Sequence, residues 1–406
     1  MHSRVMVPRA LPTMLETLGP GKFAVKRLMP LVRQLKLKPG TTRPSVETVL
    51  SAAQASKRHQ WLHDWQVGDF AVEERELLAE GANPLVNHPS NRFFHGTDVN
   101  CVALGFSHQY ALKLLRYDDV QLAATGSNFA IFRDRVIDKR STGVVLDTRP
   151  TLMRRAPVAM DVGAYCDDSY RPSNPCHFMV DRLPRMFVYQ TMLGLPQAAC
   201  ITVDAVSPYC AFALKQFAPA ATVLAPNRVY HFRKLYVLST CIKPRGHPFF
   251  YMRPEFIDAV VPKITADLPP PSADRLIYMS RFASNRRKLL NEADVAGQLE
   301  ARGFEILEMS HMTPAEQLEA VRAARVVVAP HGAALANILG ATPTTRIIEL
   351  INPEKATAAY AALSAVVGAP YEPVFGTPAD DPELQDAWRI DVEAVMGALD
   401  RPPPVA

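Results

Sequence analysis

The stretch Arg325-Val-Val-Val-Ala-Pro-His-Gly-Ala-Ala-Leu-Ala-Asn337 decides the fold of the second half of this 406-residue chain. Its β-branched run Val326–Ala329 is typical of a parallel strand that is covered on both faces. The run stops at Pro330-His331-Gly332, where glycine permits a tight turn, and small residues follow. We therefore predict a strand, a turn and then a helix over His331–Leu339.

A helix that starts after such a turn is suited to bind an anion. Its first backbone N–H groups have no partner within the helix, and its dipole is positive at this end. Ala333, Ala334 and Ala336 carry no bulk, so a phosphate can approach the backbone closely, with His331 beside it. The same pattern fits a turn that only packs, with His331 hydrogen-bonded locally, and this stretch alone leaves both readings open.

Around this stretch, apolar runs alternate with helical periodicity. We predict strands at Arg275–Arg281, Phe304–Met309, Val326–Ala329, Arg346–Ile351 and Tyr371–Phe375, and helices at Leu289–Arg302, Pro314–Ala324, Glu354–Val367 and Pro382–Leu399. This order predicts an α/β fold with a doubly wound parallel sheet. In such a sheet the ligand crevice lies at the carboxyl ends of the strands.

A second α/β unit is predicted upstream. Its elements are helices at Cys176–Leu193 and Tyr209–Phe217, and strands at Ile201–Val206, Thr222–Leu224 and Val229–Leu238. The stiff spacer Pro269-Pro270-Pro271 marks the boundary between the units. We expect a basic arm (1–60), an N-terminal α/β domain (61–268), a C-terminal Rossmann-like domain (272–378), and a helix and tail (379–406) that crosses back to the N-terminal domain.

Composition is that of an ordinary globular protein, with 48% hydrophobic and 21% charged residues. We find neither an apolar run of roughly 18 residues nor an apolar signal core, and we expect a cytoplasmic location. The six cysteines show no C-x-x-C spacing and are expected to be reduced. Cys166, Cys176 and His177 fit no common metal site.

The first 58 residues form a basic arm with only two acids, Glu16 and Glu47, in a chain of net charge +5. Basic and apolar residues alternate there, a pattern that fits a peripheral contact with an anionic membrane at its inner face. A solvated basic helix fits as well. Nucleic acid is not expected as a partner, because aromatic residues are not interleaved with the basic ones.

Two further stretches carry chemistry. In the first, which runs from Asn174 to Arg185, His177 and Asp181 stand four residues apart and share a helix face. Either side chain can accept the proton of a hydroxyl group, although the spacing also fits a structural pair within the helix.

The second stretch, Tyr278–Lys288, ends a strand at Ser280-Arg281 and continues as a cationic loop. A guanidinium such as that of Arg281 binds a diphosphate through two hydrogen bonds, and Arg286, Arg287 or Lys288 adds charge. In a doubly wound sheet this strand end and that at Pro330-His331 face one crevice.

These motifs occur in a fixed order along the chain. They are Asn174…His177-Phe178…Asp181…Leu183-Pro184-Arg185, Tyr278…Ser280-Arg281…Arg286…Leu290-Asn291-Glu292, and Pro330-His331-Gly332-Ala333…Leu335-Ala336-Asn337…Glu349-Leu350. Together they resemble glycosyltransferase family 61, of the capsular polysaccharide biosynthesis type, over roughly residues 160–352. The chain departs from the family pattern at Pro175-Cys176, where Gly or Tyr-Gly is frequent, and at Ala334-Leu335, where Gly-Leu is frequent.

The resemblance implies a GT-B architecture of two facing Rossmann-like domains. The N-terminal domain would face the acceptor, and the C-terminal domain would bind a nucleotide-sugar donor, with UDP-sugar as the first choice. It also implies inversion at the anomeric carbon, a glycan or glycolipid acceptor in cell-surface polysaccharide biosynthesis, and no cofactor or metal. The lack of an Asp-x-Asp motif after a strand fits metal independence.

On this interpretation Asp181 or His177 is the catalytic base. Donor binding falls to Arg281, Arg286, His331, Gly332, Ala333, Ala334, Asn337 and Glu349, and Asn174, Arg185 and Ser280 are further cleft candidates. Glu349 is expected to hydrogen-bond the ribose. Two alternatives stay open: a nucleotide-sugar epimerase or hydrolase, which would act without an acceptor, and a non-catalytic nucleotide-sugar-binding protein.

Overall fold

The computed structural model describes residues 64–78, 81–82, 108–109, 112–124, 129–141, 152–166, 174–195, 199–202, 208–225, 228–239, 254–284, 287–355, 358–379 and 386–403, with single positions at 47, 50, 51 and 54. Most of the predicted basic arm therefore lies outside the described residues. Within the arm, Leu50 is buried in a cluster with Trp65, and the Gln54 side chain donates a hydrogen bond to the Trp65 carbonyl at 2.8 Å. This end of the arm contacts the N-terminal sheet.

The N-terminal half is built on a sheet of nine described strands, in the order β1-β7-β6-β5-β11-β8-β9-β10 with β2 also paired to β5. The strands are β1 (Gln66–Gly68), β2 (Glu73–Leu78), β5 (Leu112–Ala124), β6 (Phe129–Arg133), β7 (Val136–Asp138), β8 (Val158–Tyr165), β9 (Ala199–Thr202), β10 (Thr222–Leu224) and β11 (Val229–Leu238). A separate pair joins β3 (Gly81–Ala82) to β4 (His108–Gln109).

This first sheet is mixed, which corrects our prediction of a doubly wound parallel sheet in both halves. Strands β11, β8, β9 and β10 run parallel, whereas β5 pairs antiparallel with β2, β6 and β11. A two-residue turn at Asp134-Arg135, with φ of 47° and 66°, joins β6 to β7. Only antiparallel strands can be joined by so short a connection.

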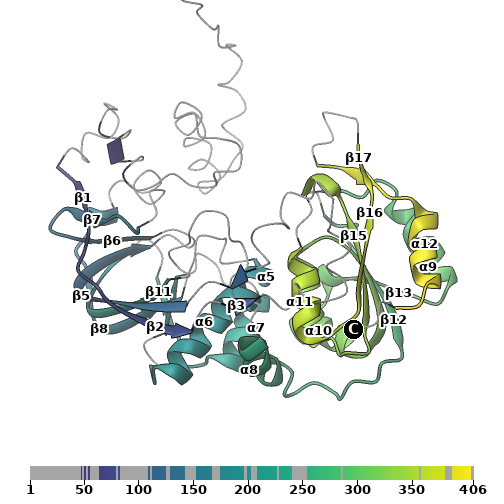
Figure 1. Ribbon diagram of the computed structural model, residues 1–406, viewed down its shortest axis with the longest axis horizontal. Helices are drawn as coiled ribbons and strands as arrows, with labels where there is room; N and C mark the ends of the chain where they lie inside the picture. Colours follow the sequence, from purple (N-terminus) through teal and green to yellow (C-terminus); the bar gives the residue numbers. More distant parts are fainter. Residues whose placement is uncertain are drawn as a thin grey trace, which may run out of the picture.

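Helices of the N-terminal half lie between the two sheets (Figure 1). The predicted helix Cys176–Leu193 is present as a continuous run of α5 (Pro175–His177), the π-helical segment η5 (Phe178–Arg182), α6 (Leu183–Phe187) and the π-helical segment η6 (Val188–Met192). The run is followed by α7 (Pro208–Phe217) and α8 (Pro254–Ile264), and both pack against α6. A short 3-10 helix, η4 (Leu152–Arg154), precedes β8.

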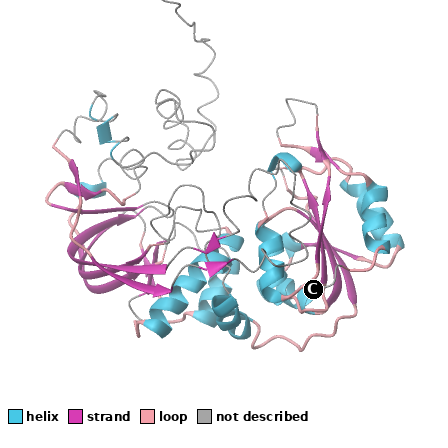
Figure 2. Cartoon of the chain, viewed as in Figure 1, coloured by secondary structure: helices cyan, strands magenta, loops and turns pink. Residues whose placement is uncertain are grey.

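The C-terminal half contains a parallel sheet of five described strands in the order β13-β12-β14-β15-β16. The strands are β12 (Arg275–Ser280), β13 (Glu305–Glu308), β14 (Ala324–Pro330), β15 (Arg346–Ile351) and β16 (Tyr371–Phe375). The connecting elements are α9 (Glu292–Ala301), η7 (Met309–His311), α10 (Pro314–Arg322), the 3-10 helix η8 (Ala333–Gly340), η9 (Pro353–Lys355) and α11 (Ala359–Val367). This is the doubly wound sheet that the alternation predicts, with helices on both of its faces (Figure 2).

Side chains alternate along these strands, so each face of the sheet has its own core. Val327 and Ile347 point to the face that packs with α10, α11 and η8, whereas Val328 and Ile348 point to the face that packs with α9 and α12 (Val392–Asp400). The first face continues into the N-terminal half, because α7 packs on α10 and α8 packs on α11 and η8. The two halves therefore share one hydrophobic core.

The C-terminal helix covers its own sheet. Helix α12 packs on α9 and β16, after a short pair of strands β17 (Thr377–Pro378) and β18 (Trp388–Arg389). Arg346 donates hydrogen bonds to the carbonyls of Ala398 at 2.6 Å and Arg401 at 2.8 Å, and it pairs with Glu372 at 2.7 Å. This anchoring corrects the expectation that the tail crosses back to the N-terminal domain. The helix that we predicted over Pro382–Leu399 is observed only from Val392.

Candidate active site

The two cationic motifs meet at the point where the strand order of the parallel sheet reverses. Strand β13 lies on one side of β12 and β14 lies on the other, so the connections leave β12 and β14 on opposite faces of the sheet. Ligands of doubly wound proteins bind at such a switch point, beyond the carboxyl ends of the strands. Arg281 directly follows β12, and His331-Gly332 directly follow β14.

Arg281 lies over Gly332 so closely that a side chain at position 332 would displace its guanidinium. A Cβ atom built on Gly332 would stand 1.9 Å from Nη1 of Arg281. The φ angle of Gly332 is 176°, an extended conformation that any residue adopts. A larger residue here would therefore displace the guanidinium, and the backbone freedom that we predicted for this turn is not used.

The Arg281 side chain and the strand end that carries it are held in place by several hydrogen bonds. The backbone N–H of Arg281 donates to Oε1 of Glu292 at 2.5 Å, and Nη2 donates to Oγ of Ser284 at 2.9 Å. Ser280, one of our cleft candidates, is buried and donates to Oε2 of Glu308 at 3.1 Å. Ser280 thus fixes the strand end and does not line the cleft.

The charge of the Arg281 guanidinium is poorly solvated. Burial lowers the pKa of Arg281, and the nearby positive charge of Arg287 lowers it further. Burial and a neighbouring positive charge both disfavour the charged form of a guanidinium. A bound anion would offset both penalties.

His331 is oriented by a buried carboxylate. Its Nδ1 atom lies 2.5 Å from Oε1 of Glu349, and the Tyr371 hydroxyl donates to Oε2 of Glu349 at 2.6 Å. Burial and the charge of Glu349 raise the pKa of Tyr371 well above its ordinary value, so this tyrosine remains a neutral donor. Because Nδ1 faces Glu349, the other ring nitrogen of His331 is the one that can meet a ligand.

The role expected for Glu349 is therefore wrong. Its side chain is completely buried, and both carboxylate oxygens already have partners, so it cannot reach a ribose. It acts on the site through His331. The reason lies in the strand register: His331 continues the face of Ala329, which pairs with Glu349 on β15, and Tyr371 points to the same face from β16.

Tyr360, near the start of α11, joins the two halves at this site. Its ring lies 5.2 Å from the His331 ring in an edge-to-face arrangement. Burial raises the pKa of Tyr360 well above its ordinary value, and a hydrogen bond with Cys176 of α5 contributes. Helix α5 also packs directly on η8. The helix that carries the proposed base therefore begins beside the donor-site turn.

Asn174 and Arg185, from the same helical run, have structural roles. Oδ1 of Asn174 accepts a hydrogen bond from the backbone N–H of Cys176 at 3.0 Å and caps the helix start. Arg185 is completely buried and donates to the carbonyl of Cys166 at 2.8 Å, which places it in the interior and not on the cleft surface. The backbone at His177 and Asp181 is helical, but their side chains lie outside the described part of the structure, as does the whole of Arg286.

Asn337, which we predicted to bind the donor, instead connects the halves. Its Oδ1 atom accepts a hydrogen bond from the Tyr209 hydroxyl of α7 at 2.6 Å. Its Nδ2 atom donates to Oε1 of Gln317 at 3.1 Å and to the carbonyl of Ala334 at 2.8 Å. These partners explain why a polar residue is buried in an apolar 3-10 helix. Ala333 and Ala334, at the start of η8, are half-buried.

Three residues of the site were missed from the sequence. Tyr360 and Tyr371 lie in predicted elements but carry no motif, and Glu292 belongs to the Leu290-Asn291-Glu292 segment without an assigned role. In the cationic loop of the Tyr278–Lys288 stretch, Arg287 is the described arginine whose charge acts on Arg281. The signal that could have found the tyrosines is their position, since polar aromatic residues stand out in apolar, buried elements.

Among the described residues, no group of three or more His, Cys, Asp or Glu side chains is arranged to hold a metal ion. In the same part of the chain, no helix has the length and apolar character needed to cross a bilayer.

A parallel sheet with cationic residues and a histidine at its switch point is an arrangement found in α/β enzymes, and the comparison with known families makes the class more specific. Residues 176–348 match the family described as glycosyltransferase 61, and the protein is a glycosyltransferase. The matched region runs from α5 into β15 and contains both Arg281 and His331. No curated protein matches the chain.

Proposed function

We propose that this glycosyltransferase moves a sugar from a UDP-sugar to a hydroxyl group of a glycan or glycolipid in cell-surface polysaccharide biosynthesis. The transfer is a single displacement that inverts the anomeric carbon and uses no metal ion. The observation that carries the donor half of this proposal is the contact of the Arg281 guanidinium with Gly332 at the switch point, next to His331.

The chemistry requires that the departing nucleoside diphosphate be stabilised. Negative charge builds on its phosphate oxygen as the bond between the donor sugar and the diphosphate breaks. Arg281 and Arg287 lie close enough for their charges to repel each other, so they offer two positive charges to one diphosphate. The backbone N–H groups at the start of η8 and the His331 ring complete a set of donors that replaces a divalent cation in this proposal.

The acceptor enters from the side of α5. In the proposal Asp181 or His177 takes the proton of the acceptor hydroxyl while its oxygen attacks the anomeric carbon opposite the diphosphate. Support comes from the packing of α5 on η8 and from the hydrogen bond of Cys176 with Tyr360, which bring this helix start to the donor site. Asp181 belongs to the π-helical segment η5, a type of wide turn that is frequent at functional sites.

The arrangement of two sheets with a shared core supports a GT-B-like architecture in which only the C-terminal half follows the Rossmann pattern. We further propose that the protein works in the cytoplasm, at the inner face of the membrane, where its basic arm meets anionic lipids. Flotation with anionic vesicles, with and without residues 1–45, tests this part of the proposal. Equal flotation of both proteins would contradict it.

The donor site is tested by thermal-shift titrations of the purified protein with UDP, CMP, GDP and ADP, with and without EDTA. A ligand that binds only the native state raises the melting temperature. We expect a shift with UDP that EDTA does not change and that Arg281→Ala abolishes. Arg275→Ala is the matched control, because it removes an arginine from the opposite end of the same strand, where it pairs with Glu305.

Three outcomes would contradict parts of the proposal. If none of the nucleotides raises the melting temperature, the proposed donor site is contradicted. If EDTA abolishes the shift, the proposed metal independence is contradicted. Release of free sugar from the donor at the same rate with and without glycan acceptors would indicate a hydrolase.

A further inference from the structure

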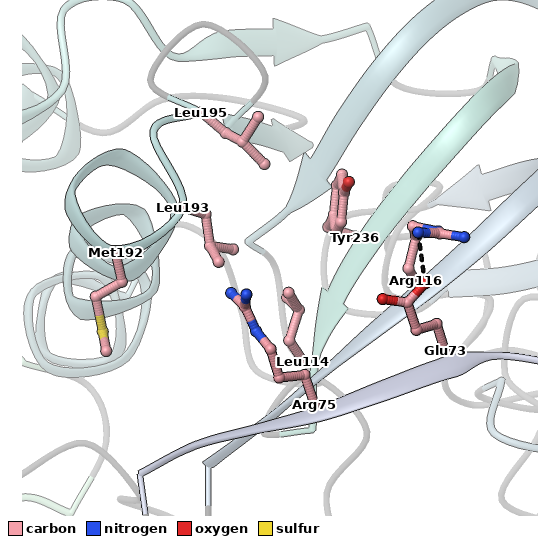
Figure 3. A pocket seen from close by; sticks show the side chains of 8 residues that line it. All are labelled: Glu73, Arg75, Leu114, Arg116, Met192, Leu193, Leu195 and Tyr236. Carbon is pink, nitrogen blue, oxygen red and sulfur yellow. Dashed lines mark ion pairs between the residues drawn. The ribbon is translucent and has the colours of Figure 1, made fainter.

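A pocket lies on the N-terminal sheet, away from the donor site, and has a volume of about 260 Å³. Its floor is formed by neighbouring strands: Glu73 on β2 pairs with Arg116 on β5, which pairs in turn with Tyr236 on β11. Two pairs further along, and so on the same face, Arg75 stands opposite Leu114. Figure 3 shows these side chains on one face of the sheet, where they surround a common space.

The wall of the pocket is built by the end of the helical run. Gly194 has a φ of 63°, the left-handed conformation that ends helices and that glycine adopts readily. The N–H of Leu195 then donates to the carbonyl of Tyr189 at 2.8 Å, which folds the chain back. As a result Leu193 and Leu195, on either side of the glycine, both line the pocket.

The two arginines of the pocket differ in their partners. Arg116 pairs with Glu73 at 2.5 Å and with Asp118 at 3.2 Å, so its charge is balanced within the protein. Arg75 is exposed and makes no side-chain hydrogen bond or ion pair with any described residue. Its guanidinium extends toward Leu193 (Figure 3). Among the described residues, the pocket therefore presents one guanidinium without an ion-pair partner beside aliphatic walls and an aromatic ring.

These features select a ligand with three properties. An anionic group matches Arg75, a flat apolar face matches Tyr236 and the leucines, and hydroxyl groups match the paired Glu73 and Arg116. The volume lies below the about 300 Å³ at which sites for larger ligands begin, so one small ring fills it. A sugar unit that carries a carboxylate has all three properties.

The pocket is too far from the donor site to hold the reacting sugar. Cys176, beside the donor site, and Met192, in the pocket wall, lie at opposite ends of one helical run. At about 1.5 Å per residue this run is about 24 Å long. We propose that the pocket binds a carboxylate-bearing sugar unit of an extended acceptor, several units away from the hydroxyl that is glycosylated. This assignment rests on the proposed function only in naming the ligand as part of the acceptor.

The test compares two sugars that differ only in the carboxylate. Ligand-observed NMR titrations of the full-length protein with glucuronic acid and with glucose give both dissociation constants. We expect glucuronic acid to bind about fivefold more tightly, which is the upper end of what an ion pair with an exposed arginine contributes. Arg75→Gln should reduce the affinity for glucuronic acid to that for glucose.

The matched control is Arg233→Gln. It removes the same charge from the opposite face of β11, where Arg233 pairs with Asp161, and should leave both affinities unchanged. Tyr236→Ala should reduce the affinity for both sugars by a similar factor. Melting temperatures verify that each variant is folded.

Equal affinities of the wild-type protein for both sugars would overturn the inference, as would an unchanged affinity in Arg75→Gln. Competition by inorganic phosphate as strong as that by glucuronic acid would also overturn it, because the site would then recognise charge alone. If glucuronic acid binds through Arg75 but no nucleotide shifts the melting temperature, the pocket stands and the proposed function fails. If UDP raises the melting temperature but glucuronic acid does not bind through Arg75, only the assignment of the pocket fails.

Discussion

Replacement of Gly332 by alanine tests how the donor site is assembled. The new methyl group would stand 1.9 Å from Nη1 and 3.1 Å from Cζ of Arg281. Ordinary contact begins at 3.4 Å, so the guanidinium must move by about 1.5 Å. The backbone itself is not strained, because a φ of 176° is open to alanine.

A displacement of this size breaks the bidentate geometry that a guanidinium offers to a diphosphate. Loss of one charged hydrogen bond costs about 1.5–3 kcal/mol, which corresponds to an increase in the dissociation constant for UDP of roughly 10- to 150-fold. Calorimetric titration with UDP measures this change directly. The melting temperature should stay within a few degrees of the wild-type value, since the change alters the end of one flexible side chain.

Gly297→Ala is the matched control. Gly297 lies in α9, and a Cβ atom built on it meets nothing within 4 Å. It should leave UDP affinity unchanged and stabilise the protein by about 0.5–1 kcal/mol, as expected for glycine to alanine within a helix.

The double variant Gly332→Ala with Arg281→Ala gives the decisive comparison. If Gly332 acts only by making room for Arg281, its replacement has no further effect on affinity once Arg281 is absent. Additive losses in the double variant, or an unchanged affinity for UDP in the single variant Gly332→Ala, would refute the reasoning.

Three other predictions concern parts of the fold that support the site. Hydrogen bonds outweigh the desolvation of Glu308 and hold its pKa below the ordinary value of 4.5, so its stabilising effect is present above that pH and is lost as the pH falls through the lower folded pKa. Glu308→Gln should therefore flatten the dependence of the melting temperature on pH between about pH 5 and 3, and an unchanged slope would contradict this. Removal of Arg346 from its buried pair by substitution with leucine should destabilise the protein by about 3–5 kcal/mol in urea unfolding, against about 0–1 kcal/mol for exposed Arg275→Ala. Glu349→Gln, which removes the charge that orients His331, should slow UDP release from the donor about 10-fold or more without unfolding the protein, and wild-type rates would show that the pair has no part in turnover.

The C-terminal sheet could be predicted closely, because its strands are buried on both faces and appear as continuous apolar runs. The bounds of β15 and β16 agree with those predicted, and β12 and β14 differ by one or two residues at their ends. The N-terminal sheet could not be predicted in this way. Strand β5 carries Arg116, Asp118 and Asp119 along its 13 residues, and β2 is mostly charged, so neither shows a pattern of burial in the sequence.

The same contrast holds for the site. Arg281 and His331 were found because each follows an apolar strand, and the topology of a doubly wound sheet places those ends together. The roles of Glu349 and Asn337 depend on which side chains lie opposite them in space. Their partners Tyr371 and Tyr209 are separated from them by 22 and 128 residues in the chain, and no local pattern contains that information.

The shared core has a consequence for any attempt to exchange acceptor specificity between enzymes of this kind. The polyproline segment before β12 looks like a natural boundary at which the C-terminal half could be separated and joined to another protein. Such a fragment would expose the apolar faces of α10, α11 and η8 that α7 and α8 now cover, and it would leave Asn337 without Tyr209. The matched family region, residues 176–348, extends across this boundary and includes α7, α8, α10 and η8, whereas α11 lies after it. A functional chimera would therefore have to move the helices α5 to α8 together with the parallel sheet, and exchange only the outer strands of the N-terminal sheet.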